Sequence, residues 1–118
     1  IPSYKVYEDD KTVAFLDIYT VIPGHTLVLP KKQIEFIWDL ETEDYTAVMA
    51  TVKKVALRMR DVMGVQYVGE KIIGTDVPHA HVHLIPFNTP GEMRNVGHES
   101  AEPDHTALTV LAEKLYFE

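Results

Sequence analysis

The sequence predicts an α+β protein with a mainly antiparallel sheet, one long helix and one C-terminal helix. Three observations carry this prediction. Short β-rich runs are separated by polar turns, one long segment has helical periodicity, and strands and helices do not alternate as they do in a parallel α/β sheet. With 118 residues, the chain is expected to form a single domain over residues 1–118.

The first half of the chain carries most of the strand signals. Residues 4–8 and Thr12–Leu16 are β-rich and flank a short polar turn, which is the pattern of a hairpin. After a loop that closes with a Pro-Gly turn, residues 25–29 form the third expected strand, and Pro30 is expected to end it. This region therefore predicts three strands in succession.

The strongest periodic signal runs from Thr42 to Met63 and predicts an amphipathic helix. Thr42 is expected to cap its first turn, and Gly64 to end it. A shorter helix is expected around Ile34 and Ile37, with Trp38 either in the core or at a dimer contact. The apolar residues of the long helix recur three and four positions apart: Tyr45, Val48, Met49, Val52, Val55, Ala56, Met59 and Val62.

The second half adds two strands, a loop and a helix. Strands are expected at residues 65–71 and 80–86. Residues 88–103 are rich in proline, glycine and polar side chains, and are expected to form a surface loop. Asp104 is expected to cap a C-terminal helix whose inward side chains are Leu108, Leu111, Ala112 and Leu115.

Composition excludes several function classes. The chain has no cysteine, which removes disulfide frameworks, thiolate zinc sites and cysteine nucleophiles. Its formal net charge of −7 disfavours non-specific binding to nucleic acid or to an anionic membrane. No apolar run approaches the ~18–20 residues of a membrane span. We therefore expect a cytoplasmic protein with no nucleic-acid partner and no membrane partner.

Three of the six histidines alternate along one of the expected strands. Side chains on a strand alternate between faces, so His79, His81 and His83 are expected to share one face. The other face is apolar and is expected to pack against a helix; it carries Ala80, Val82 and Leu84.

Three interpretations of this histidine face are open. It can be a solvated strand face, a metal site or a nucleophilic centre. A metal site is awkward because the outer Cα atoms of three such positions span ~13 Å at ~3.3 Å per residue. A nucleophilic histidine needs a neighbour that fixes its tautomer and a donor for phosphate oxygens. His81 is flanked on both sides, so it is the expected nucleophile, with His79 supporting it and His83 aimed at the phosphate or leaving group.

The sequence resembles the histidine-triad (HIT) family of nucleotide hydrolases and transferases, closest to its nucleoside phosphoramidase branch. The resemblance covers residues 4–86. It rests on the signature His79-Ala80-His81-Val82-His83-Leu84-Ile85 and on three further stretches: Phe15-Leu16-Asp17-Ile18, the run from Pro23-Gly24-His25 to Lys31-Lys32, and Gly74-Thr75-Asp76-Val77-Pro78.

The resemblance implies catalytic roles. His81 would form a nucleotidyl-histidine intermediate, with its other ring nitrogen held by the backbone carbonyl of His79. His83 would bind phosphate and assist the leaving group, and His25 would complete a chain of histidine hydrogen bonds through His79. The implied reaction is hydrolysis of nucleoside 5′-phosphoramidates or related nucleoside monophosphate derivatives, releasing AMP or GMP without a metal or other cofactor.

The resemblance also implies a nucleotide site and a partner. Asp17 would accept hydrogen bonds from the ribose hydroxyls, and Phe15 and Ile18 would line the base pocket. The α-phosphate would be bordered by Gly74, Thr75, Asp76 and Val77. A homodimer is implied, in which helix 42–63 and strand 65–71 meet their symmetry mates.

Other interpretations are compatible with the same residues. Asp17 can serve as a turn residue, His25 as a polar residue at a strand start, and Gly74 as a tight-turn residue. The alternative functions are a dinucleoside polyphosphate hydrolase, a purine-nucleotide-binding module with little turnover, and a metalloenzyme.

Overall fold

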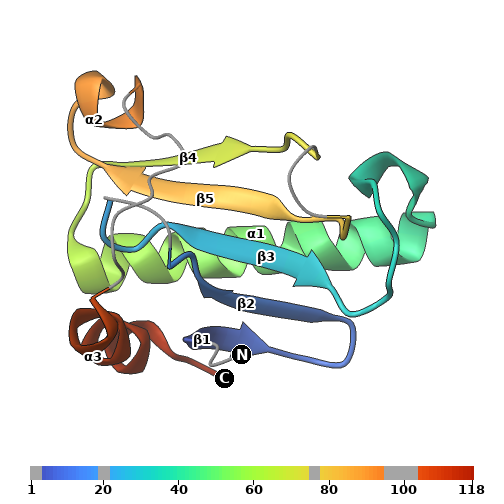
Figure 1. The fold of residues 1–118 in the computed structure, drawn as a ribbon, viewed down its shortest axis with the longest axis horizontal. Helices are drawn as coiled ribbons and strands as arrows, with labels where there is room; N and C mark the ends of the chain where they lie inside the picture. Colours follow the sequence, from blue (N-terminus) through green and yellow to red (C-terminus); the bar gives the residue numbers. More distant parts are fainter. Residues whose placement is uncertain (1–3, 19–21, 75–77, 95–103) are drawn as a thin grey trace.

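A computed structural model describes residues 4–18, 22–74, 78–94 and 104–118. They form a five-stranded sheet in the order β1-β2-β3-β5-β4, with every neighbouring pair antiparallel (Figure 1). The predicted α+β fold is thus confirmed. The strands are β1 (Lys5–Glu8), β2 (Thr12–Leu16), β3 (Thr26–Pro30), β4 (Tyr67–Lys71) and β5 (Val82–Phe87); the helices are η1 (Ile37–Asp39), α1 (Thr42–Met63), α2 (Pro90–Arg94) and α3 (His105–Leu115).

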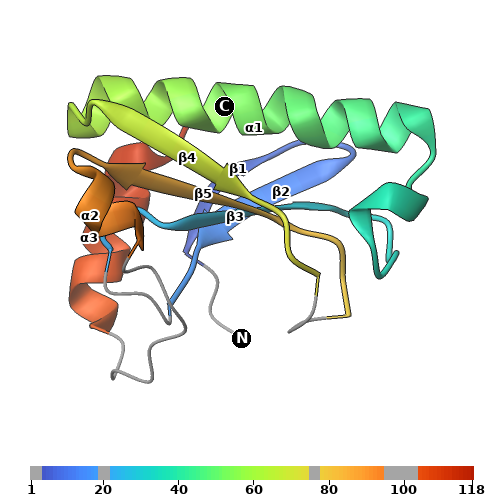
Figure 2. The same cartoon turned by 90° about the horizontal axis from the view of Figure 1, so that it is seen from above.

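The two faces of the sheet differ because α1 covers one of them along its length (Figure 2). Burial alternates along β2 and β3, with fully buried residues on the α1 side and partly buried ones on the other. Val28, Val82 and Leu84 are buried on the α1 side with the apolar stripe of the helix. The core therefore lies between α1 and the sheet. The side chains of β2 and β3 on the opposite face are only partly buried.

Helix α1 has the predicted bounds, but its N-cap differs by one residue. Thr42 is the first helical residue, and Glu41 is the N-cap, with extended backbone angles and no capping side-chain bond. The Glu41 carbonyl accepts the first helical hydrogen bond from Tyr45 N at 2.9 Å, which places the boundary there. The predicted end is confirmed, because Gly64 has a left-handed φ of 65°.

The C-terminal part contains one predicted helix and one that was not predicted. Asp104 caps α3 as expected, accepting a hydrogen bond from Ala107 N at 3.0 Å. Helix α2 lies inside the stretch predicted as loop, so that prediction was wrong over Pro90–Arg94. The Glu92 carboxylate accepts bonds from the backbone N–H groups of Asn88 and Thr89, at 2.7 and 2.9 Å, which stabilises this short turn.

Strand boundaries shift by one or two residues because loop contacts take some backbone groups. β3 runs one residue later than predicted and includes Pro30, which pairs with Thr12. β5 begins two residues late, since the Ala80 N–H donates to Ile34 O at 2.7 Å and not to a strand. β4 also begins two residues late, because Gln66 N donates to the Asn88 side chain.

The short helix expected around Ile34 is a single 3-10 turn over Ile37–Asp39. Ile37 is buried, whereas Trp38 is 71% exposed. A core position for Trp38 is therefore wrong, and a dimer contact stays a prediction. Within the part of the chain that the structure describes, no helix is long and apolar enough to cross a bilayer.

Candidate active site

Three histidine rings gather on the side of the sheet away from α1. His83 lies on β5 with its side chain opposite in direction to the buried Val82 and Leu84. Its ring centroid is 5.1 Å from that of His25, which precedes β3, and 4.9 Å from that of His81, which precedes β5. Two segments separated by more than fifty residues thus bring these rings together.

The orientation of His81 is set by the backbone of the residue two positions earlier. Its Nδ1 donates to the carbonyl oxygen of His79 at 2.8 Å. A carbonyl only accepts, so the proton is on Nδ1 and Nε2 carries a lone pair. This is the hydrogen bond expected from the sequence resemblance, and it gives His81 the tautomer of a nucleophile. The residue as a whole is buried, with 6% of its surface exposed.

His79 and His25 are not linked as the sequence resemblance implied. The Nε2 of His79 donates to the carbonyl of Pro30 at 2.8 Å, while His25 Nε2 bonds His83 Nδ1 at 2.9 Å. The expected chain from His25 through His79 is therefore wrong. The reason is the register of β3 against β5, which places His83 beside Leu27 and within reach of His25.

In the hydrogen bond between His25 and His83, His25 is the favoured donor. The carboxylate of Asp17 lies 3.7 Å from His25 Nε2, which favours a proton on that nitrogen. His25 then donates to His83 Nδ1, and the His83 proton sits on Nε2. The remaining nitrogen of His25, Nδ1, is buried and has no hydrogen-bond partner within the described ranges.

Burial keeps this pair neutral. It lowers the pKa of His83 to about 4; the charges of His25 and His81 act in the same direction, Asp17 opposes them, and Lys71 contributes a smaller lowering. Burial also lowers the pKa of His25, against the opposing effect of Asp17. A bound phosphate would raise the pKa of His83, since an adjacent anion favours the charged imidazole.

Of the residues expected to bind a nucleoside, Asp17 lies beside this cluster. Asp17 follows β2, and its backbone N–H donates to His25 O at 2.8 Å, which ties the two residues together. Phe15 and Ile18 are partly buried. Phe15 pairs with Leu27, which pairs in turn with His83, so the three side chains share one face.

The glycine of the expected phosphate loop has a left-handed backbone conformation. Gly74 has a φ of 85°, which side-chain-bearing residues rarely adopt, and a Cβ there would lie 3.5 Å from the ring of Phe36. The other three expected residues of this loop, Thr75, Asp76 and Val77, lie outside the described residues.

The metal alternative falls on a different set of residues from the triad. Among the described residues, one ligand atom each from Asp17, His25 and His83 lies within 4.8 Å of the others. Two imidazoles and a carboxylate suit divalent zinc or related ions. In the structure, however, His25 Nε2 and His83 Nδ1 are hydrogen-bonded to each other.

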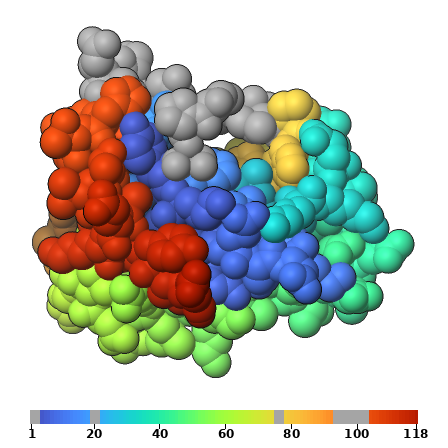
Figure 3. All heavy atoms as spheres, turned by 90° about the horizontal axis from the view of Figure 1, so that it is seen from below, coloured from blue at the N-terminus to red at the C-terminus, as the bar shows by residue number. Residues whose placement is uncertain are grey.

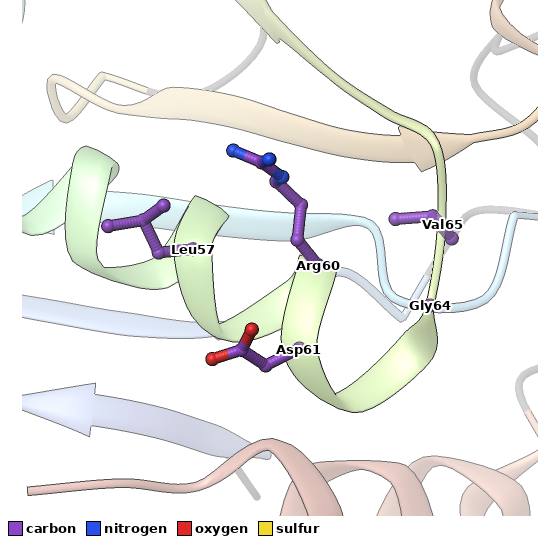
Figure 4. A pocket seen from close by; sticks show the side chains of 5 residues that line it. All are labelled: Leu57, Arg60, Asp61, Gly64 and Val65. Atoms are coloured by element: carbon purple, nitrogen blue, oxygen red, sulfur yellow. The ribbon is translucent and has the colours of Figure 1, made fainter.

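Two hollows of the described surface lie away from the histidines. One of about 470 Å³ lies on the last turns of α1, where the Arg60 and Asp61 side chains point in different directions (Figure 4). Another of about 350 Å³ borders Asp9, Lys11 and Lys54. Neither hollow is lined by a histidine. We assign the chemistry to the histidine cluster because of its own geometry.

Sequence reasoning did not single out one residue at this site, Lys71. It pairs directly with His83 across β4 and β5. The sequence offers no local signal for this pairing, because it depends on the register between β4 and β5.

Comparison with known proteins places the chain in a family. Residues 1–89 match the HIT domain. The chain belongs to the HIT domain family. Proteins of this family bind nucleotides.

Several HIT relatives are similar over much of this chain. "Protein hit" of Bacillus subtilis is 44% identical over 98 residues, covering 78% of this chain and 67% of that protein. Adenosine 5′-monophosphoramidase HNT1 of Saccharomyces cerevisiae is 34% identical over 116 residues, covering 98% and 73%. The crystal structure of a Hit-like protein involved in cell-cycle regulation from Bartonella henselae superposes with a TM-score of 0.81 at 32% identity, covering 98% of this chain and 85% of that one.

Proposed function

We propose that this HIT protein hydrolyses nucleoside 5′-phosphoramidates or related nucleoside monophosphate derivatives and releases AMP or GMP. The observation that carries the proposal is the hydrogen bond from His81 Nδ1 to the His79 carbonyl, which leaves Nε2 free to attack. A similar chain, from Saccharomyces cerevisiae, is an adenosine 5′-monophosphoramidase.

The reaction proceeds in two displacements. His81 Nε2 attacks the α-phosphorus, the P–N bond to the amine breaks, and the amine leaves with a proton. Water then attacks the same phosphorus and returns a proton to His83, the bond to His81 breaks, and the nucleoside monophosphate departs. His83 donates a hydrogen bond from Nε2 to a phosphate oxygen and supplies the leaving-group proton when the bound phosphate has raised its pKa.

The other residues position the nucleotide. Asp17 accepts hydrogen bonds from the ribose hydroxyls, and Phe15 and Ile18 contact the base. Apolar and aromatic side chains beside a carboxylate suit a nucleoside, which presents a flat base and a vicinal diol. The backbone turn at Gly74 and the following Thr75, Asp76 and Val77 border the α-phosphate.

The test is AMP release from adenosine 5′-phosphoramidate in EDTA, measured by chromatography. We expect turnover by the wild type and a loss of more than ~10³-fold in His81→Ala. His105→Ala, an exposed histidine on α3, is the matched control and keeps full activity.

A third variant separates the His79 carbonyl from its ring. His79→Ala keeps the backbone acceptor for His81 and removes only the bond to Pro30. We expect its rate of AMP release to fall by no more than ~10²-fold, the size of a positioning defect. Equal loss in His79→Ala and His81→Ala would contradict this assignment of roles.

Other outcomes point to the alternatives. Cleavage confined to dinucleoside polyphosphates would replace the phosphoramidate as substrate. Nucleotide binding without turnover would indicate a binding module. Activity that requires added Zn²⁺ or Ni²⁺ would make the group formed by Asp17, His25 and His83 a metal site.

We also propose a homodimer through the exposed side of α1 and the edge strand β4. Leu57 on α1 and Tyr67 on β4 are 46% and 45% exposed, which suits coverage by a second copy. Sedimentation velocity tests this: a dimeric wild type and a monomeric Leu57→Glu variant are expected, and a monomeric wild type would contradict the proposal.

A further inference from the structure

A row of paired residues crosses the open face of the sheet through the active site. Phe15 on β2 pairs with Leu27 on β3, Leu27 pairs with His83 on β5, and His83 pairs with Lys71 on β4. Directly opposed residues in an antiparallel ladder point to the same face, so all four side chains lie on the side away from α1. The strands can be followed side by side in Figure 1.

The chemical character of this row changes from one end to the other. Phe15 and Leu27 are apolar and partly buried, His83 is the central imidazole, and Lys71 is a cation at the last residue of β4. Strands are spaced about 4.8 Å apart, so Lys71 lies one strand beyond His83 in the direction away from the apolar end.

Lys71 is close enough to affect the histidines, and no acidic side chain of the described ranges forms an ion pair with it. After burial, which is the main cause, its charge contributes to the lowered pKa of both His83 and His25. The side chain is partly buried, and none of the ion pairs among the described residues involves it. The adjacent carboxylate, Glu70, pairs with Leu84 and therefore points to the opposite face.

We propose that Lys71 is a specificity residue that receives a negatively charged leaving group. The inference rests on the proposed function, in which the base lies near Phe15 and the α-phosphate at His81 and His83. The leaving group then extends past His83 toward β4, where an ammonium meets it. The preferred substrates are nucleoside monophosphate derivatives whose leaving group carries a carboxylate or a phosphate. The reaction itself is unchanged: the bond from phosphorus to the leaving group breaks, and that group departs with a proton.

The test uses two substrates that differ in one charge. AMP joined through nitrogen to glycine has a carboxylate on its leaving group, and AMP joined to glycinamide has a neutral amide of similar shape. We expect the wild type to have a kcat/KM about five- to tenfold higher for the glycine compound, the effect of one partly exposed charge pair.

Variants of Lys71 assign the preference to that residue. Lys71→Met is expected to lower the ratio of the two kcat/KM values to about one, Lys71→Glu to invert it, and Lys71→Arg to retain it. Lys53→Met, which removes an exposed charge from α1 on the other side of the sheet, leaves the ratio unchanged. A ratio that survives in a folded Lys71→Met protein would overturn the proposal.

Failure of the proposed function has a separate signature. If the wild type releases no AMP from either compound, the affinities of the same two compounds are measured by calorimetry. The same preference for the glycine compound, lost in Lys71→Met, would support the role of Lys71 in binding. Equal affinities would overturn it.

Discussion

At the scale of single residues, the site is organised by hydrogen bonds to backbone carbonyls. His81 and His79 each donate one ring N–H to a carbonyl, of His79 and Pro30 respectively. Because a carbonyl cannot donate, each bond selects one tautomer without help from a second side chain. The tautomer of the nucleophile is therefore a property of the local backbone and survives changes in the side chain of residue 79.

A single residue, His83, is expected to make the stability of the protein depend on pH. The pKa of His83 is about 4 in the folded protein, mainly through burial, against ~6.5 for an unperturbed imidazole. As the pH falls from 6.5 to 4, the imidazole is protonated in the unfolded chain but stays neutral in the folded protein. The free energy of unfolding therefore decreases over this window. We expect the free energy of unfolding to decrease by about 1–2 kcal/mol, a value reduced to allow for the partial exposure of the ring.

Urea unfolding at pH 7 and pH 5 measures this loss. His83→Gln is expected to lose less stability than the wild type between the two values, while His105→Gln, with an exposed side chain, behaves as the wild type does. An identical pH slope in the wild type and His83→Gln would contradict the assignment.

At the scale of elements, two glycines end or join segments for different physical reasons. Gly64 ends α1 with a φ of 65°, and a Cβ there would have nothing within 4 Å. Gly24 has a φ of 91°, and a Cβ would lie 2.8 Å from Met63 Sδ and 2.9 Å from Pro86 Cγ. The turn before β3 therefore packs directly onto the end of α1 and onto β5.

This difference predicts unequal costs for the same substitution. Gly64→Ala is expected to cost about 1 kcal/mol, the penalty for a left-handed alanine. Gly24→Ala is expected to cost about 3 kcal/mol or more, because steric overlap adds to the backbone strain. Urea midpoints with unchanged slopes measure both, and equal costs would contradict the close packing at Gly24.

Met63→Ala provides a check on the cause. In that background the side chain nearest to residue 24 is shortened, so the added cost of Gly24→Ala becomes smaller, although contact with Pro86 persists.

At the scale of the whole molecule, the C-terminal helix is tied to the rest of the fold by a few polar contacts. Figure 3 shows the C-terminal segment against the strands at the start of the chain. Arg58 on α1 donates to the carbonyls of Lys114, Leu115 and Tyr116 at 3.0 to 3.3 Å. Phe117 N donates to Val6 O at 3.1 Å, which fixes the chain against β1. Arg58 thus satisfies the last carbonyls of α3.

We expect Arg58→Met to destabilise the protein by about 2 kcal/mol, the value of charge-assisted hydrogen bonds with some solvent exposure. The loss falls on α3, so hydrogen exchange at the amides of Leu111 and Leu115 becomes faster, while that of β3 changes little. Arg60→Met, an exposed arginine on the same helix, is the control. Uniform acceleration across the sheet would contradict a local role.

The sequence by itself determined the features that depend on local pattern. The bounds of α1, its end at Gly64, the cap at Asp104 and the antiparallel α+β class all follow from periodicity and from turn and cap residues, which act over a few positions. The alternation of the histidines is also local, and the bond between His81 and the His79 carbonyl, which the family resemblance implied, joins residues two positions apart.

Only the tertiary structure decided which distant groups meet. It joined His25 to His83 and not to His79, and it placed Lys71 opposite His83. It also shortened β5 when Ala80 bonded to Ile34. These contacts depend on strand register, which is set by how all five strands pack against α1. A shift of one residue would reverse the face of each side chain, so no single segment carries the information.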